Sequence, residues 1–264
     1  SPFIIGKRQV LMIYLLVFLM GVVVFSYLNY VIERLPKKQK IFTRKSYCKF
    51  CEHEQKIMDV FPIISRIRFQ NRCRYCGEKL PIRPLLVELL GGAIACLDVF
   101  FYGVSFEALL VFVVACDLAL ITFIDLDTQE IPPQFNYALL VLGIVSYFVL
   151  DGPDLKERII GLFAVSVPMF ILALFHGFGG GDVKLMFAAG FLLGWKGNVA
   201  ACLIGIVTSS IYAVISLATK KKGRKDQFPF GPYLSAGIYI SLIMNFGQRL
   251  VQMYINYAQN VIHK

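Results

Sequence analysis

The stretch QVLMIYLLVFLMGVVVFSYLNYVI, residues 9–32, decides the fold class of this 264-residue chain. It contains no charged residue, and it is longer than the roughly 20 apolar residues that a helix needs to cross a bilayer. The run is too long for the apolar core of a cleaved secretory signal, and no small-residue cleavage site precedes the polar segment that follows. We therefore expect residues 1–32 to form a membrane anchor that stays in the protein.

The rest of the chain has the composition of a polytopic membrane protein. Hydrophobic residues make up 57% and charged residues only 17%, with a mean hydropathy of +0.66, whereas soluble domains contain about 25% charged residues. Because lipid offers the backbone no hydrogen-bond partners, the spans should be α-helices. The sequence predicts an all-α membrane protein with about eight transmembrane helices, at residues 9–32, 85–101, 108–124, 135–150, 159–176, 184–194 and beyond, 199–218 and 232–247.

The positive charge of the chain is concentrated in two loops. The net charge is +10, and of the 27 Lys and Arg residues 14 lie in residues 33–83 and five in residues 220–225. If residues 33–83 are cytoplasmic and the helices alternate, 20 basic residues face the cytoplasm and seven face outward, which is the bias of the positive-inside rule. The charge therefore indicates topology and attraction to anionic lipids, and it gives no reason to expect nucleic-acid binding.

This topology divides the chain into three parts. Residues 1–32 form the first transmembrane helix, residues 33–83 a polar cytoplasmic domain, and residues 84–264 a helical membrane core. The polar domain has few large apolar residues, and domains of its size need a metal or disulfides for stability.

Two C-x-x-C pairs lie in this polar domain, separated by 21 residues. They are Cys48-Lys-Phe-Cys51 and Cys73-Arg-Tyr-Cys76. Paired knuckles of this kind are typical of zinc sites, and four thiolates complete a tetrahedral sphere, so the zinc would be structural. Gly77 follows where the second turn needs conformational freedom. Two disulfides, four free thiols, or His53 as a substitute ligand are the alternatives, and a reducing cytosol disfavours the disulfides.

Acidic residues lie at the ends of two apolar segments, where charge is costly enough to indicate function. Asp125 and Asp127 end one segment ahead of Pro132-Pro133, and Asp182 opens another. The predicted topology places both groups at cytoplasmic helix ends. Two carboxylates brought together cannot both ionise easily, so such a pair can activate a water, as in aspartic proteases. A run of glycines before Asp182 would let another chain approach closely: Gly179, Gly180 and Gly181.

Each of these residues also has a plainer interpretation. Asp182 is suited to cap a helix, and Asp125 to be a solvated interfacial residue. Asp127 faces a different direction from Asp125, so we expect it to have a supporting or water-facing role. Lys184 is an interfacial side chain of the snorkelling kind, whose charge would also help to stabilise the ionised form of the pair.

Six collinear segments resemble the type IV prepilin leader peptidases, which belong to the G-x-G-D class of membrane aspartyl proteases. The two knuckles resemble those of the family's cytoplasmic domain, and GGGD (179–182) fits G-x-G-D. FIDLDTQEIP (123–132) resembles its first aspartate motif, in which the catalytic Asp lies seven residues before the Pro. The other three are similar to its first-helix signature, its entry into the second helix and a late Pro-Phe-Gly-Pro element: GVVVFSYLNYVIERLP (21–36), LLVELLGG (85–92) and PFGPYL (229–234).

The resemblance implies that Asp125 and Asp182 are catalytic in a multi-pass enzyme of the bacterial cytoplasmic membrane. The enzyme would cut the basic leader from type IV prepilins or pilin-like pseudopilins after a Gly, at the cytoplasmic face. The resemblance also implies N-methylation of the new N-terminus with S-adenosylmethionine, a step associated in the family with the zinc-knuckle domain. Glu88 is a candidate contact for this methyl donor. The chain departs from the family at Pro133, where Asp is common.

Other functions stay open from the sequence. A peptidase without methyltransferase activity fits the same aspartates. A proton-coupled transporter should have its acids near the bilayer midplane, whereas these acids lie at helix ends. In a non-catalytic zinc-anchored scaffold both aspartates should be dispensable. A presenilin-like peptidase would have a Tyr-Asp first motif and no paired knuckles, the opposite of this chain.

Overall fold

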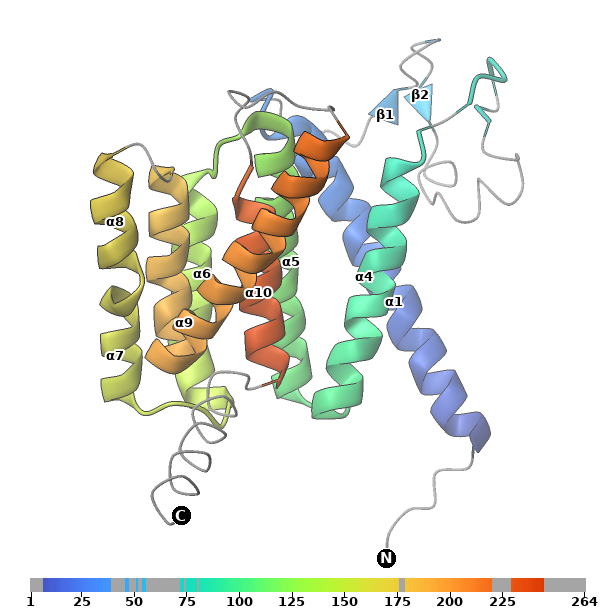
Figure 1. Cartoon of the computed structure of the whole chain (residues 1–264). Coiled ribbons are helices and arrows are strands. Elements are labelled where there is room, and N and C mark those ends of the chain that lie inside the picture. The colour runs from blue at the N-terminus through green and yellow to red at the C-terminus, as the bar shows by residue number, and fades with distance from the viewer. Residues whose placement is uncertain are drawn as a thin grey trace, which may run out of the picture. The chain divides into compact units, whose positions relative to one another are not determined.

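The structure is a computed structural model of the whole chain (Figure 1). It describes residues 7–38, 46–47, 51, 54–55, 72–73, 75–79, 81–175, 179–219 and 229–244. The chain divides into two compact units, Ser1–Val104 and Ser105–Lys264. The three-part division predicted from the sequence follows helix ends rather than these units, and it stays a prediction.

The first unit pairs two long helices, α1 (Lys7–Arg34) and α4 (Arg83–Tyr102). A short strand β1 (Ser46–Tyr47) pairs antiparallel with β2 (Glu54–Gln55) in the segment between them. The helices pack closely through glycines, because a Cβ on Gly91 would overlap the ring of Phe25. Close contact over small residues is the usual way for helices to pack in lipid.

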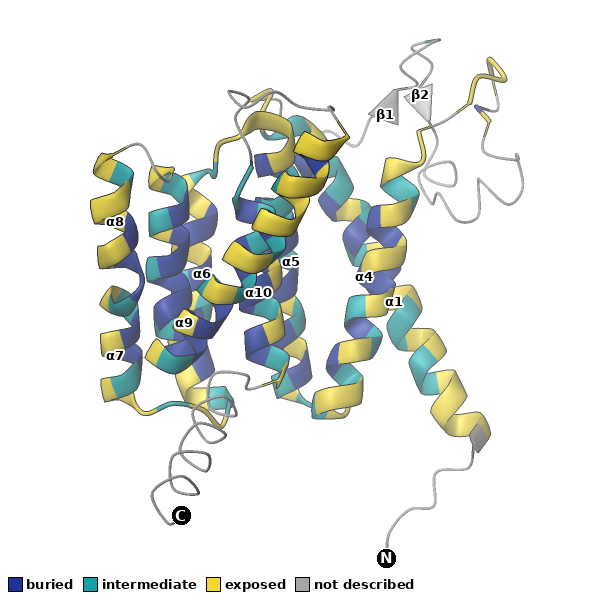
Figure 2. Cartoon of the chain, in the orientation of Figure 1, coloured by how far each residue is buried: buried dark blue, intermediate teal, exposed yellow. Residues whose placement is uncertain are grey.

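In its described residues, the second unit is a bundle of six helical elements. They are α5 (Phe106–Thr128), α6 (Pro133–Val149), α7 (Leu155–Ala164), α8 (Ser166–Leu174), α9 (Gly180–Ala218) and α10 (Gly231–Met244). α9 packs against α6, α7, α8 and α10, while α5 packs against α6 and α10. Buried residues line the faces that the helices turn to one another, and large apolar side chains such as Phe148, Phe170 and Val214 remain exposed (Figure 2). An apolar outer surface of this kind suits a lipid environment.

The predicted fold class, an all-α polytopic membrane protein, is confirmed. In the described part of the chain, five helical segments are long and apolar enough to cross a membrane: α1, α4, α5, α9 and the α7–α8 segment Leu155–Leu174. α6 and α10 are shorter apolar helices. Counting the two arms of α9 separately, these segments match the eight that the sequence predicts.

α9 consists of two arms because its backbone breaks at Gly194, where φ is 68° and ψ is 173°. The Asn198 side-chain amide donates a 3.1 Å hydrogen bond to the carbonyl of Met186. In an unbroken helix these residues would be about 18 Å apart, so the second arm, which begins at Trp195, folds back on the first. The sequence predicts this break through the separate apolar runs 184–194 and 199–218.

A buried arginine lies at the break. Arg158 is 1% exposed, and its Nη1 donates to the carbonyls of Phe191 and Leu192 at 3.1 and 3.3 Å and to Ser146 Oγ at 2.8 Å. Carbonyls in the last turn of a helix have no partner within the helix, and lipid supplies none. Arg158 therefore stabilises the end of the first arm.

Candidate active site

Asp125 lies in the last turn of α5, where the chain is about to leave the helix. Gln129 adopts the left-handed conformation, with φ 56°, and its N–H bonds the Asp125 carbonyl at 2.8 Å. Pro132 and Pro133 follow, and Pro133 is the first residue of α6, a position that suits proline because its missing N–H is not needed there. The sequence thus ends α5 within one turn of Asp125 and turns the chain back into the bundle.

The Asp125 carboxylate is buried against the first residue of another helix. The side chain is 5% exposed, and its Oδ2 accepts a 3.0 Å hydrogen bond from the N–H of Gly231, which begins α10. A Cβ on Gly231 would lie 2.7 Å from Oδ2, so this close approach requires glycine. The sequence showed Gly231 only as part of the late Pro-Phe-Gly-Pro element, and its contact with Asp125 was missed.

Asp182 lies in the first turn of α9 and is 8% exposed. The helix begins at Gly180 with Gly179 as its N-cap, so Asp182 is the third helical residue and not the N-cap itself. Its Oδ2 accepts a 3.3 Å hydrogen bond from the N–H of Gly179, which is the return half of a capping box. Asp182 therefore stabilises the helix start and still directs its other oxygen elsewhere.

The three glycines of the run differ in their surroundings. A Cβ on Gly181 would lie 3.1 Å from the Cβ of Ile131, which belongs to the turn after Asp125. A Cβ on Gly179 would lie 3.1 Å from Asp182 Oδ2, whereas one on Gly180 would meet no atom within 4 Å. The close approach seen here is within the chain, between the two aspartate motifs, and the approach of another chain at these glycines stays a prediction.

The two aspartate motifs are in contact, because Gly181, next to Asp182, lies against Ile131 of the turn after Asp125. The end of α5 and the starts of α9 and α10 lie at the same end of the bundle (Figure 1). Among the described residues each carboxylate receives one backbone N–H, through Oδ2 in both cases. Oδ1 of each residue has no hydrogen bond from the described residues, so each can bind a water or a peptide group. Two such carboxylates can divide the roles of general base and general acid.

The two other charged candidates lie at the surface of this end. Asp127 and Lys184 are both exposed, and each lies within one helical turn of a buried aspartate. Lys184 also lines a cavity between α6, α8 and α9.

Three of the four predicted zinc ligands lie in described residues. The sulfur atoms of Cys51, Cys73 and Cys76 all lie within 4.8 Å of one another. Gly77 has φ +72° and its N–H bonds the Cys73 carbonyl at 2.9 Å, which closes the second knuckle, as the sequence predicts. Three converging thiols fit a zinc or similar soft metal ion. Cys48 and the alternative ligand His53 lie outside the described residues.

Glu88, the candidate contact for a methyl donor, lies on α4 and is 1% exposed. Its burial leaves little of the carboxylate open to a soluble cofactor in this conformation. The geometry therefore does not fit Glu88 as a direct ligand of S-adenosylmethionine, and we assign no residue to that cofactor.

Comparisons with known proteins agree with the motifs. The Bacterial Peptidase A24 N-terminal domain matches residues 19–102, and the Type IV leader peptidase family matches residues 110–214. No solved structure matches the chain significantly.

Curated relatives named "Prepilin leader peptidase/N-methyltransferase" match most of the chain. One from Neisseria gonorrhoeae is 28% identical, over 93% of this chain and 92% of its own. One from Legionella pneumophila is 27% identical, over 92% of this chain and 95% of its own. One from Burkholderia pseudomallei (strain 1026b) is 29% identical, over 78% of this chain and 69% of its own. The resemblance deduced from the motifs is confirmed, and the chain belongs to the type IV leader peptidase family of membrane enzymes.

Proposed function

We propose that this protein cleaves the basic leader peptide from type IV prepilins or pilin-like pseudopilins after a Gly. The names of its relatives support this substrate class. The observation on which the proposal depends is the burial of Asp125 and Asp182 at one end of the bundle, each bonded to a backbone N–H of a helix start. A transporter is less well supported, since neither acid lies midway along its helix.

In the proposed reaction Asp125 and Asp182 bind a water between them. The ionised carboxylate takes a proton from the water while the water oxygen attacks the scissile carbonyl carbon. The neutral carboxylic acid donates its proton to the carbonyl oxygen, which gives a tetrahedral intermediate with two hydroxyl groups. As the C–N bond breaks, the carboxyl that took the water's proton gives it to the scissile nitrogen, and the other carboxylate takes a proton back from one hydroxyl, which releases the leader and the new amino terminus. Gly231 and Gly179 position the two carboxylates through their N–H groups.

The proposed orientation places the aspartates at the cytoplasmic face of a bacterial membrane. Its support is the distribution of charge: with the aspartate ends of the helices inside, 20 of the 27 basic residues lie in the cytoplasm. The short basic leader of a substrate would reach the carboxylates from the same side.

The proposal includes N-methylation of the new N-terminus, which the names of the relatives support. S-adenosylmethionine would supply the methyl group. Residues 33–83 would form the associated domain, with a structural zinc bound by Cys48, Cys51, Cys73 and Cys76. The convergence of three of these thiols supports the zinc.

The test is to incubate the full-length protein in detergent with a prepilin and S-adenosylmethionine and to read the product masses. Asp125→Asn and Asp182→Asn should each lower the cleavage rate by about a thousandfold, since general acid–base catalysis contributes about 10²–10⁴-fold. Asp151→Asn, which changes an exposed acid of the same unit that has no role in the proposed site, is the matched control and should keep the rate roughly unchanged. Cleavage by a folded Asp125→Asn protein would refute the assignment. A cleaved product without the methyl mass would identify a peptidase that lacks the second activity.

A further inference from the structure

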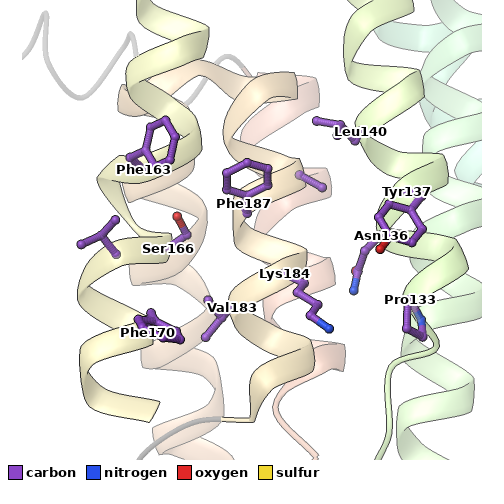
Figure 3. Close-up of a pocket in the computed structure, with 12 residues that line it drawn as sticks. Pro133, Asn136, Tyr137, Leu140, Phe163, Ser166, Phe170, Val183, Lys184 and Phe187 are labelled. Carbon is purple, nitrogen blue, oxygen red and sulfur yellow. The ribbon is translucent and has the colours of Figure 1, made fainter. Parts of the chain in front are cut away.

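A cavity of about 370 Å³ lies between α6, α9 and the α7–α8 segment (Figure 3). Val183 and Lys184, the two residues after Asp182, form part of its wall, and Pro133, at the end of the turn that follows Asp125, forms another part. The residues that directly follow each aspartate motif thus line the cavity.

The walls of the cavity are mainly apolar, and four of the lining residues are aromatic. Tyr137 lines it from α6, Phe163 from the end of α7, Phe170 from α8 and Phe187 from α9. The rings of Phe163 and Phe187 pack edge to face with their centroids 5.7 Å apart. Such walls favour an apolar occupant.

Two buried polar residues interrupt this apolar lining, Ser166, whose hydroxyl donates to the Leu162 carbonyl, and Asn136. Asn136 is 5% exposed, and within the described part of the chain neither its Nδ2 nor its Oδ1 has a hydrogen-bond partner. Figure 3 shows its side chain directed into the space between α6 and α9, toward which Lys184 also extends. A buried amide with no partner costs about 1–3 kcal/mol, so this group is suited to an occupant that supplies both an acceptor and a donor.

A peptide backbone supplies that combination. A protease must hold the substrate extended at the scissile bond, which frees peptide N–H and C=O groups from any helix. Near lipid such groups find no water and cost several kcal/mol if they stay unpaired. The amide of Asn136 offers one donor group and one acceptor, whereas a lipid acyl chain would leave both unpaired.

We propose that this cavity is the subsite for the apolar substrate segment next to the scissile bond, and that Asn136 binds its backbone. The inference rests on the proposed peptidase function and deepens it. Asn136 acts as a substrate-binding residue, and the four aromatic residues select the substrate side chain.

The first test compares kcat and KM for prepilin cleavage by the full-length protein. Asn136→Leu keeps the approximate volume but removes both hydrogen bonds, so kcat/KM should fall about tenfold, the equivalent of one hydrogen bond of about 1.4 kcal/mol, while the melting temperature holds or rises. Asn136→Gln, which restores the amide, should recover part of the loss. The matched control is Val141→Ala, an exposed residue of α6 outside the cavity, which should leave kcat/KM unchanged.

The second test changes the shape of the cavity. Phe187→Ala should shift the preferred residue next to the scissile bond toward larger side chains, measured on prepilins that carry Ala, Leu, Phe or Trp there. A prepilin with 4-benzoylphenylalanine at that residue should crosslink to Tyr137 or Phe187.

The outcomes separate this inference from the proposed function. One outcome is that Asp125→Asn is inactive, while Asn136→Leu and Phe187→Ala are folded and keep the kcat/KM and the residue preference of the natural protein. The proposed subsite is then wrong, and the proposed peptidase function is retained. Labelling of Tyr137 and Phe187 by a photoreactive fatty acid and not by the prepilin would identify a lipid site and overturn the inference. Cleavage by Asp125→Asn would overturn the proposed function itself.

Discussion

The first arm of α9, Gly180–Leu193, has a buried acidic side chain at its N-terminal end and a buried basic side chain at its C-terminal end, as the helix dipole favours. At the N-terminal end, Asp182 lies where backbone N–H groups are unpaired. At the C-terminal end, Arg158 donates to the carbonyls of Phe191 and Leu192. Both charges lie where the dipole favours them.

The ends differ in how completely their charged groups are bonded. Arg158 donates to four backbone carbonyls and one hydroxyl and is 1% exposed. Asp125 and Asp182 each receive one backbone N–H from the described residues and are 5% and 8% exposed. A buried group with several hydrogen-bond partners stabilises one arrangement, whereas a carboxylate with one oxygen still unbonded can bind a reactant. We infer that the arginine end is structural and the aspartate end reactive.

The largest expected effect on stability is at the arginine end. Arg158→Met should lower the free energy of unfolding by more than about 3 kcal/mol, since several buried acceptors lose their donor at about 1–3 kcal/mol each. Thermal unfolding in detergent measures the change. Lys156→Ala removes an exposed basic residue from the same helix and should have little effect. Equal melting temperatures for the two variants would show that Arg158 is not structural.

A smaller effect is expected from a single methyl group at the aspartate end. Gly231→Ala would place a Cβ 2.7 Å from Asp125 Oδ2, and displacement of a catalytic group by about 1 Å can cost 100-fold in rate. We expect cleavage to slow by about 10- to 100-fold, with a modest change in melting temperature.

The control for Gly231 is in the glycine run itself. A Cβ on Gly180 would meet no atom within 4 Å, so Gly180→Ala should cleave prepilin at close to the natural rate. If both variants slow equally, the Gly231–Asp125 contact does not explain the effect.

The cluster of thiols in the first unit, Cys51, Cys73 and Cys76, gives a third prediction. The protein should contain one zinc ion per chain by elemental analysis, and Cys76→Ser should lose it because a thiolate ligand is removed. Asp182→Asn should retain the zinc, since Asp182 belongs to the other unit. Retention of zinc by Cys76→Ser would exclude the predicted site.

The smallest effect should come from an ion pair near the arginine end. Lys196 Nζ lies 2.6 Å from Glu157 Oε1, and both side chains are 27% exposed. Partly exposed pairs contribute about 0–1 kcal/mol, so Lys196→Ala should lower the melting temperature far less than Arg158→Met. A larger loss would show that this pair and Arg158 act as one network.

The sequence predicts well what depends on neighbouring residues. Each apolar run specifies its own helix, and the break near residue 194 follows from two separate runs. Asp125 and Asp182 stand out because each acid lies at the end of such a run. The chemistry of both residues stays a prediction until the variants are measured.

The contacts that the sequence missed are long-range. Gly231 donates to an aspartate 106 positions earlier, and no local pattern reveals that pairing. From the sequence, Arg158 is an ordinary basic residue on the outer side of the membrane. Most of its hydrogen-bond acceptors come from two other helices, and no local pattern shows them. Lys184, interpreted as an interfacial side chain, in fact also lines a cavity.

The backbone reversal at Gly194 also determines whether the number of membrane crossings between Asp125 and Gly231 is odd or even. A straight helix of 39 residues would be about 58 Å long, roughly twice the thickness of the hydrocarbon core. The reversal turns one crossing into two, so α10 starts on the side where α5 ends. With an odd number of crossings between them, Asp125 and the N–H of Gly231 would lie in different compartments.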